Sequence, residues 1–297
     1  MSEITPALRR RSFLLGGAAG IGAGLTTATA AHAANANNPN GSPIPTLPGE
    51  VWRDVTRYSR IGKKPYEVID VLQDGDMARL YVPWTAKLKG MVPGALVWYY
   101  HTYGWSYTSM DRTYAYPGML CVDQDAVSIC PDYGGNIWTS ERAISLQRTW
   151  STWATNTFSI GRSFARSHSG GCALMIYAYG KNMLRNQRGI YVVNGVYDME
   201  DMYARSPETV GPAYNNDPVA IATTNPARFP QTAWTGKRLK IIVSEADTMV
   251  PPGPHGLALA EKASPVAVSC TTVFHDDGHN VPAFVNNDMM ITFRSWA

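Results

Sequence analysis

The sequence predicts an α/β protein with a mostly parallel sheet that is covered by helices on both faces. Apolar runs of strand length alternate with helical patterns after an initial hairpin, which is typical of such sheets. The runs are continuously apolar, as expected for strands buried on both faces. Hydrophobic residues make up 45% of the 297 residues and charged residues 16%, so the chain is expected to fold rather than to stay disordered.

The sheet is predicted to begin with a hairpin. Residues 66–72 and 77–82 are predicted strands, and the Gln-Asp-Gly-Asp turn at 73–76 suits a tight connection between them. Residues 95–100 and 126–130 are unbroken apolar and aromatic runs, which indicates two further strands buried on both faces.

The rest of the chain continues the alternation of strands and helices. Residues 141–158 are predicted to form a helix, because residues such as Ile144 and Trp150 supply an apolar side. Further helices are predicted at 170–179, 257–262 and 281–296. Further strands are predicted at 162–167, 189–193, 239–244 and 266–274.

The segment 197–236 interrupts this alternation. It is rich in Pro, Asn, Tyr and Met and has no clear period. In this architecture such an insertion often forms a cap over the active site, which is what we expect here. The alternative is a long surface loop without a role.

The first 33 residues have the features of a twin-arginine signal peptide. The arginines at 9–11 precede Ser12, Phe13 and a Gly- and Ala-rich stretch, and 31–33 fits a small-residue cleavage site. The mature chain is therefore expected to be secreted, or to lie in the periplasm or cell envelope. A membrane anchor is the alternative, but a stretch so rich in Gly and Ala would be a weak spanning helix, so no stable anchor is expected. Residues 34–59 are predicted to be a flexible leader.

Charge and cysteine content restrict the partners and cofactors. Removal of the signal peptide takes away three arginines and one glutamate and lowers the net charge from +3 to +1, so no nucleic-acid partner is expected. An oxidising compartment favours disulfides, and the nearest pair in sequence is Cys121 with Cys130, which leaves Cys172 with Cys270. Free buried cysteines are the alternative. No cysteine or histidine spacing indicates a zinc site, and no metal or organic cofactor is expected.

Ser169 is the candidate nucleophile. It stands between a predicted strand and a predicted helix, with Gly170 and Gly171 after it, as a sharp nucleophile elbow requires. The usual Gly-x-Ser-x-Gly pattern has Ser167 in place of its first glycine here, and the strand before it is unusually polar.

Asp247 and His279 are the candidate acid and base, so the three residues occur in the order nucleophile, acid, base. Asp247 follows a buried strand, where a carboxylate can reach the histidine, and Glu245 is the competing acid. His279 lies on the loop after the last strand, and His275 is its rival. A serine needs such a base to take its proton, and the base needs an acid to orient it.

The oxyanion of an acyl-transfer intermediate needs two backbone N–H donors. Gly170, directly after the nucleophile, is expected to supply one. The other is expected from the turn after the third predicted strand, where Thr102 and Tyr103 are equal candidates.

These residues together resemble the α/β-hydrolase superfamily over 60–297. The resemblance implies an eight-stranded, mostly parallel sheet with the 197–236 insertion between strands six and seven. It also implies a catalytic domain that hydrolyses its substrate through an acyl-enzyme.

The expected activity is that of an exported serine esterase acting on a small-molecule or polymer ester. Aromatic residues near the predicted elbow could contact the substrate, and Tyr103, Trp105 and Tyr197 are the candidates. A peptidase of the same fold uses the same triad and is one alternative. A non-catalytic binding protein on this scaffold is another. The sequence does not indicate an oligomeric state.

Overall fold

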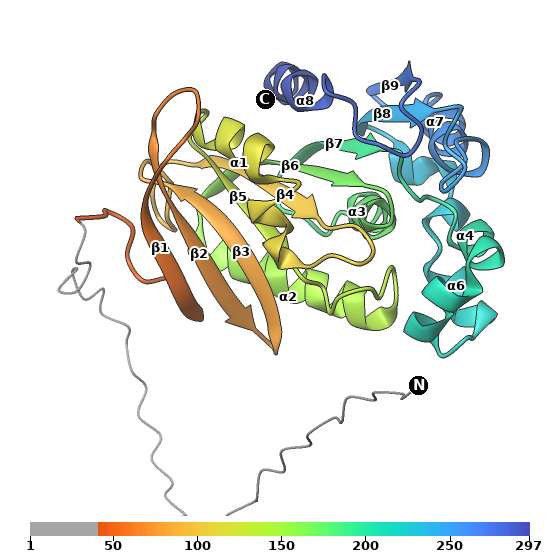
Figure 1. Ribbon diagram of the computed structural model, residues 1–297, viewed down its shortest axis with the longest axis horizontal. Coiled ribbons are helices and arrows are strands. Elements are labelled where there is room, and N and C mark those ends of the chain that lie inside the picture. The colour runs from red at the N-terminus through yellow and green to blue at the C-terminus, as the bar shows by residue number, and fades with distance from the viewer. Residues whose placement is uncertain (1–40) are drawn as a thin grey trace, which may run out of the picture. The chain divides into compact units, whose positions relative to one another are not determined.

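The computed structural model describes residues 41–297, which contain one nine-stranded sheet with the strand order β1-β2-β3-β5-β4-β6-β7-β8-β9 (Figure 1). The strands are β1 (Glu50–Tyr58), β2 (Pro65–Gln73), β3 (Asp76–Pro83), β4 (Gly94–Tyr100), β5 (Ala126–Pro131), β6 (Ile160–His168), β7 (Gln187–Val193), β8 (Arg238–Ser244) and β9 (Ser269–His275). Neighbours from β5 to β9 are parallel, whereas β1, β2, β3 and β5 pair antiparallel. The predicted fold class is confirmed.

Helices cover both faces of this sheet. The α-helices are α1 (Ala115–Val122), α2 (Glu141–Thr157), α3 (Gly171–Gly180), α4 (Met199–Arg205), α5 (Pro207–Val210), α6 (Pro218–Thr224), α7 (Ala258–Ala263) and α8 (Val285–Ser295). Shorter turns are η1 (Tyr107–Asp111), η2 (Gly211–Tyr214), η3 (Pro226–Arg228), η4 (Gln231–Trp234) and η5 (Gly253–Leu257). Among the residues described, no helix is both long and apolar enough to cross a membrane.

Alternate residues of the central strands pack into two separate cores. Trp98 and Tyr100 of β4 face α2, α3 and α7, whereas Val97 and Tyr99 face α1 and α8. Figure 1 shows α1 and α8 on one side of the sheet and α2 and α3 on the other. Because side chains alternate across a strand, a strand between two helical layers must be apolar at every position.

The predicted leader is wrong from Glu50 onward, because β1 is a strand and raises the count from the expected eight to nine. It pairs with β2 along its length. Arg53 of β1 also donates to the carbonyl oxygens of Ile44 and Pro45 and forms an ion pair with buried Glu67. These charged residues gave β1 no apolar pattern to recognise. The predicted signal peptide lies outside the described residues.

The expected disulfides are contradicted, since all four cysteines are free. Each thiol contacts a non-cysteine partner instead. The Sγ atom of Cys121 lies 3.2 Å from the Tyr99 hydroxyl, and that of Cys172 lies 3.9 Å from the Val193 carbonyl oxygen. Cys130 and Cys270 contact the carbonyl oxygens of Pro131 and Ala260. Burial raises the thiol pKa of Cys121 to about 11.

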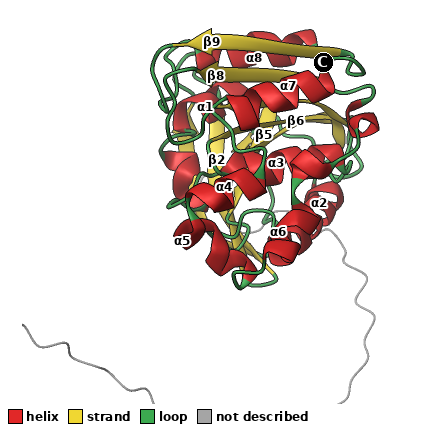
Figure 2. Cartoon of the chain, turned by 90° about the vertical axis from the view of Figure 1, so that its right-hand side faces the viewer, coloured by secondary structure: helices red, strands yellow, loops and turns green. Residues whose placement is uncertain are grey.

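The segment 197–236 lies between β7 and β8 and forms short helices from α4 to η4. Helices α4 and α6 lie beyond the carboxyl ends of the parallel strands (Figures 1 and 2). A third apolar cluster joins this segment to the domain, with Met199, Val210 and Ile221 packed together with Trp138 and Ala173. The insertion therefore lies at the edge of the sheet where the predicted site residues emerge.

Candidate active site

Ser169 occupies a strained turn between β6 and α3. Its φ is 58°, a left-handed conformation that is costly for a residue other than glycine. The turn is held because the Ser169 N–H donates to the Val193 carbonyl oxygen at 3.0 Å. A Cβ on Gly171 would lie 2.2 Å from the His101 carbonyl oxygen, so this position requires glycine. Strain of this kind is characteristic of a nucleophile elbow.

Ser167, which stands where the usual motif has glycine, is fully buried and hydrogen-bonded. Its Oγ atom donates to the Tyr100 carbonyl oxygen at 2.9 Å. A buried hydroxyl with a partner costs little, because its hydrogen-bonding capacity is met. The departure from the usual motif is therefore compatible with a tight elbow.

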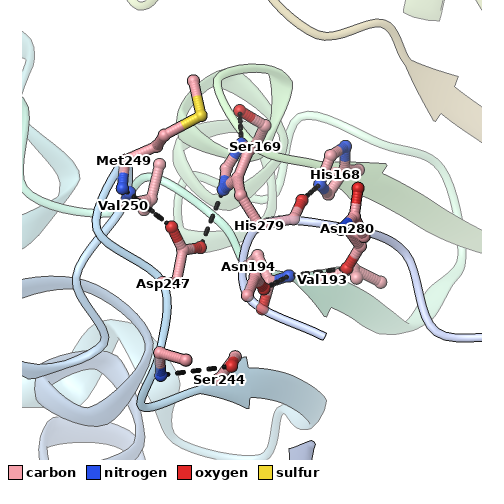
Figure 3. Close-up of polar contacts among 12 residues, drawn as sticks. His168, Ser169, Val193, Asn194, Ser244, Asp247, Met249, Val250, His279 and Asn280 are labelled. Atoms are coloured by element: carbon pink, nitrogen blue, oxygen red, sulfur yellow. Dashed lines mark hydrogen bonds and ion pairs between the residues drawn. The ribbon is translucent and has the colours of Figure 1, made fainter. Parts of the chain in front are cut away.

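The Ser169, His279 and Asp247 side chains form a continuous hydrogen-bonded line (Figure 3). The Ser169 hydroxyl lies 2.8 Å from His279 Nε2, and His279 Nδ1 lies 2.7 Å from Asp247 Oδ2. The other Asp247 oxygen accepts the N–H groups of Met249 and Val250, each at 2.9 Å. Asp247 is thereby fixed with one oxygen directed at the imidazole. This arrangement can deprotonate a serine hydroxyl as it attacks an acyl carbon.

The competing acid and base do not join this line. Glu245 is exposed to solvent. His275 Nε2 instead donates to Asn194 Oδ1 at 3.1 Å. The structure therefore brings Asp247 and His279 to Ser169 and leaves the rival residues aside.

The loop that carries His279 is held by two side chains from neighbouring strand ends. His168 Nε2 donates to the His279 carbonyl oxygen at 2.9 Å. Asn194 Nδ2 donates to the carbonyl oxygens of Gly278 and Asn280 at 3.0 and 2.9 Å. Three consecutive carbonyl groups are thus anchored (Figure 3). Asn194 has no sequence signal for this role other than its place directly after a buried strand.

Burial is the main reason why the pKa of His168 falls to about 4, and the nearby His279 adds to the shift. The two rings lie 4.9 Å apart between centroids. His168 is therefore neutral near pH 7. A neutral ring that donates from Nε2 supports the loop and adds no positive charge next to His279.

The loop after β4 brings backbone N–H groups next to Gly170. A Cβ on Gly170 would lie 3.5 Å from the Tyr103 nitrogen, so the Tyr103 N–H lies beside the residue that follows Ser169. Side chains from the loop after β5 hold this turn in place. The Gly104 N–H donates to Asn136 Oδ1 at 2.7 Å, and His101 Nε2 donates to the Asp132 carbonyl oxygen at 2.7 Å.

A small hollow lies beside these N–H groups, and Tyr103, Trp105 and Tyr197 differ in their relation to it. Tyr103 lines it and stacks on Trp138, with centroids 5.6 Å apart. Trp105 does not line it and instead lies under the Arg112 guanidinium. Tyr197 is only 2% exposed and packs in the core, which corrects the expectation that it contacts substrate. Trp138 also lines the hollow, although no sequence pattern marks it as a site residue.

No group of three potential metal ligands occurs within residues 41–297.

Comparison with known proteins identifies the fold. No family model matches the chain, and no curated protein matches it. Among solved structures, S-formylglutathione hydrolase from Agrobacterium tumefaciens is similar over 84% of this chain and 100% of that one, at 13% identity and a TM-score of 0.56. Acetyl xylan esterase from Paenibacillus sp. R4 is similar over 83% and 88%, at 12% identity and a TM-score of 0.59.

The chain has the α/β-hydrolase fold. A third similar structure is acylaminoacyl peptidase from Pyrococcus horikoshii, which matches over 74% of this chain and 38% of that one, at 10% identity and a TM-score of 0.54. The fold is thus shared by ester hydrolases and by a peptidase. Fold alone does not determine the reaction, which has to be argued from the site.

Proposed function

We propose that the chain is an exported serine hydrolase that cleaves a carboxylic ester through an acyl-enzyme intermediate. The hydrogen-bonded line from Ser169 through His279 to Asp247 carries this proposal, because its distances of 2.8 and 2.7 Å suit proton transfer. The predicted signal peptide at 1–33 is the basis for proposing export.

In the proposed reaction, Ser169 Oγ attacks the acyl carbon while His279 Nε2 takes the hydroxyl proton. Asp247 holds the imidazole through Nδ1 and stabilises the imidazolium. The N–H groups of Gly170 and Tyr103 bind the oxyanion of the tetrahedral intermediate, with Tyr103 preferred over Thr102 because its nitrogen lies next to Gly170. His279 then protonates the leaving alcohol, and water releases the acyl group by the same steps in reverse.

Support for an ester rather than an amide comes from the similar structures, which include an acetyl xylan esterase. Peptide hydrolysis is the second candidate function, because one similar structure is an acylaminoacyl peptidase. We further propose that 197–236 acts as a cap, since it packs beyond the strand ends that carry the triad.

The test is to label the purified chain with a fluorophosphonate and to locate the label by peptide mass spectrometry. Label on Ser169 in the folded protein, and none in Ser169→Ala or in heat-unfolded protein, is the expected result. The activity of unlabelled enzyme is then compared on aryl acetates and on the matching peptide amides. Faster amide cleavage would favour the peptidase, and a folded protein without label would favour a binding protein.

A further inference from the structure

Trp138 has an unusual position next to the proposed oxyanion-binding groups. Its φ is 50°, although it is a bulky residue, and its side chain is only 8% exposed. A Cβ on Gly170 would lie 2.7 Å from Trp138 Cζ3, so the indole ring is in direct contact with the residue after Ser169. A large residue kept in a strained conformation at this place points to a role that a smaller residue would not fill.

The cap segment holds the Trp138 ring in place. The indole Nε1 atom donates to the Thr209 carbonyl oxygen at 3.1 Å, and the ring packs in the cluster that includes Val210 and Tyr214. On its other side the ring stacks on Tyr103 with an interplanar angle of 19°. The ring is therefore clamped between the cap and the turn after β4.

Trp138 and Tyr103 form part of the wall of the hollow beside Gly170. The complete lining is Tyr100, His101, Thr102, Tyr103, Tyr133, Gly135, Asn136, Trp138, Gly170, Gly171 and Leu174. These residues come from the ends of β4 and β5 and from the start of α3. None comes from β8, β9 or the loops that carry Asp247 and His279, so the hollow lies on the side of Ser169 away from the base.

This placement determines which part of an ester the hollow would receive. The leaving alcohol takes its proton from His279 Nε2, so the alcohol must lie on the His279 side of the acyl carbon. The carbonyl oxygen lies at the Gly170 and Tyr103 N–H groups. The acyl tail is then directed to the remaining side, into the hollow that Trp138 bounds.

The space in the hollow is small. Its cavity volume is about 30 Å³, and a site needs at least roughly 10–15 Å³ to hold one water. An acetyl or propionyl tail fits such a space, and a longer chain would meet the indole ring.

We infer that Trp138 is the specificity-determining wall of an acyl pocket that accepts acetyl and propionyl groups and rejects longer acyl chains. The inference rests on the proposed esterase function and adds to it the class of acyl group. It also assigns the cap a part in specificity, since Thr209 fixes the orientation of the wall.

The experiment measures kcat/KM for the p-nitrophenyl esters of acetate, butyrate and hexanoate. In the wild-type protein we expect acetate to exceed hexanoate by at least tenfold, since misfit of a methylene in a tight pocket changes kcat/KM by about 10-fold or more. Trp138→Ala is expected to raise the hexanoate-to-acetate ratio by at least tenfold. Trp138→Phe, which keeps an aromatic wall but loses the hydrogen bond to Thr209, is expected to raise the ratio less than Trp138→Ala does. Trp52→Ala, a substitution of an exposed tryptophan on β1, serves as the matched control and leaves the ratio unchanged.

Two results would overturn the inference. One is a wild-type protein that hydrolyses hexanoate as fast as acetate, which needs no variant to fold. The other is a folded Trp138→Ala protein whose ratio stays within threefold of wild type. Failure of the proposed function gives a different pattern, namely no Ser169-dependent hydrolysis of any ester. In that case, labelling of Ser169 by p-nitrophenyl phosphonates with methyl or hexyl tails still decides the pocket, and equal labelling rates would contradict it.

Discussion

The antiparallel half of the sheet uses its polar side chains differently from the parallel half. In β1–β3 they form ion pairs with one another. Asp111 of η1 accepts hydrogen bonds from Arg57 at 2.8 Å, from Arg79 and from the Tyr81 hydroxyl at 2.6 Å. Arg79 also donates to both carboxylate oxygens of Asp70. These pairs join β1, β2, β3 and η1 into one network.

At the carboxyl ends of the parallel strands, several residues have a strained backbone. Left-handed φ values occur at Tyr133 and Trp138 after β5, at Ser169 after β6 and at Asn194 after β7. Each of these residues lies near the hollow or the triad. Left-handed φ values also occur in the antiparallel half, at Lys63 and Asp74, but both lie in the turns between antiparallel strands. The contrast indicates that charge pairing secures one half of the sheet, whereas strained loops in the other half position reactive groups. Substitutions in the two halves should therefore affect different properties.

Ser169→Ala should give the largest effect and should leave stability unchanged. Removal of a triad nucleophile lowers turnover by about 10⁶-fold, which corresponds to roughly 8 kcal/mol of transition-state stabilisation. The measurement is hydrolysis of p-nitrophenyl acetate, with thermal unfolding as the control. Activity within tenfold of wild type would exclude Ser169 as the nucleophile.

Asp247→Asn is expected to lower turnover by about 10⁴-fold, or roughly 5 kcal/mol, because the amide favours the wrong tautomer of His279. Glu245→Gln is the matched control, since Glu245 is the nearby exposed acid. Steady-state kinetics on the same ester measure both variants. Equal losses in the two variants would show that the carboxylate does not act through His279.

Arg79→Met tests the antiparallel half of the sheet. It should lower the free energy of unfolding by about 3 kcal/mol, while kcat stays the same. Removal of one member of a mostly buried ion pair leaves uncompensated charge, here on Asp70 and Asp111. Arg205→Met, which removes an exposed pair with Asp201, is the control and should leave the free energy of unfolding close to that of the wild type. Urea unfolding measures both. A loss of kcat without a loss of stability would contradict the division between the halves.

Asn194→Gly removes the side chain that anchors the His279 loop without creating backbone strain, because Asn194 has a φ of 41°. We expect kcat to fall by about 10- to 100-fold with little change in KM, since a small displacement of a catalytic group has effects of this size. This equals roughly 1.4 to 2.7 kcal/mol. An unchanged kcat would show that the loop holds its position through His168 alone.

The two halves should also respond to pH in opposite directions. Burial raises the pKa of Glu67 to about 7, so the folded state keeps a proton that the unfolded state releases. The resulting stability is present below about pH 4.5 and is lost as pH rises to 7. His168 has a pKa near 4, so its contribution is present above about pH 6.5 and is lost as pH falls towards 4.

Glu67→Gln and His168→Gln separate these two effects. Each group changes the free energy of unfolding by at most about 1.4 kcal/mol per pH unit within its window. Between pH 4 and 7, Glu67 makes the free energy of unfolding fall as pH rises, whereas His168 makes it rise. Glu67→Gln should remove the fall, and His168→Gln should remove the rise. Identical pH profiles for both variants and the wild type would contradict the assignment.

Several features of the fold could be predicted because they depend on local pattern. Apolar runs such as 95–100 identify strands buried on both faces, and they correspond to β4 and its neighbours. Strand β6 was harder to recognise, because Ser163, Arg166 and Ser167 are polar yet buried. Their partners are distant in sequence, as in the bond from Arg166 to Asn286 at 2.6 Å. Strand β1 was not recognised because its charged residues, such as Arg53 and Asp54, leave it without an apolar pattern.

The sequence by itself determined the alternation of strands and helices along the chain and the three candidate residues Ser169, Asp247 and His279. Strand ends, glycines and residue type are local signals, and the carboxyl ends of parallel strands share one edge. Only the tertiary structure decided the free cysteines, the burial of Tyr197, the anchoring by Asn194 and the place of Trp138. Each of these depends on contacts between segments far apart in the chain, which no local pattern encodes.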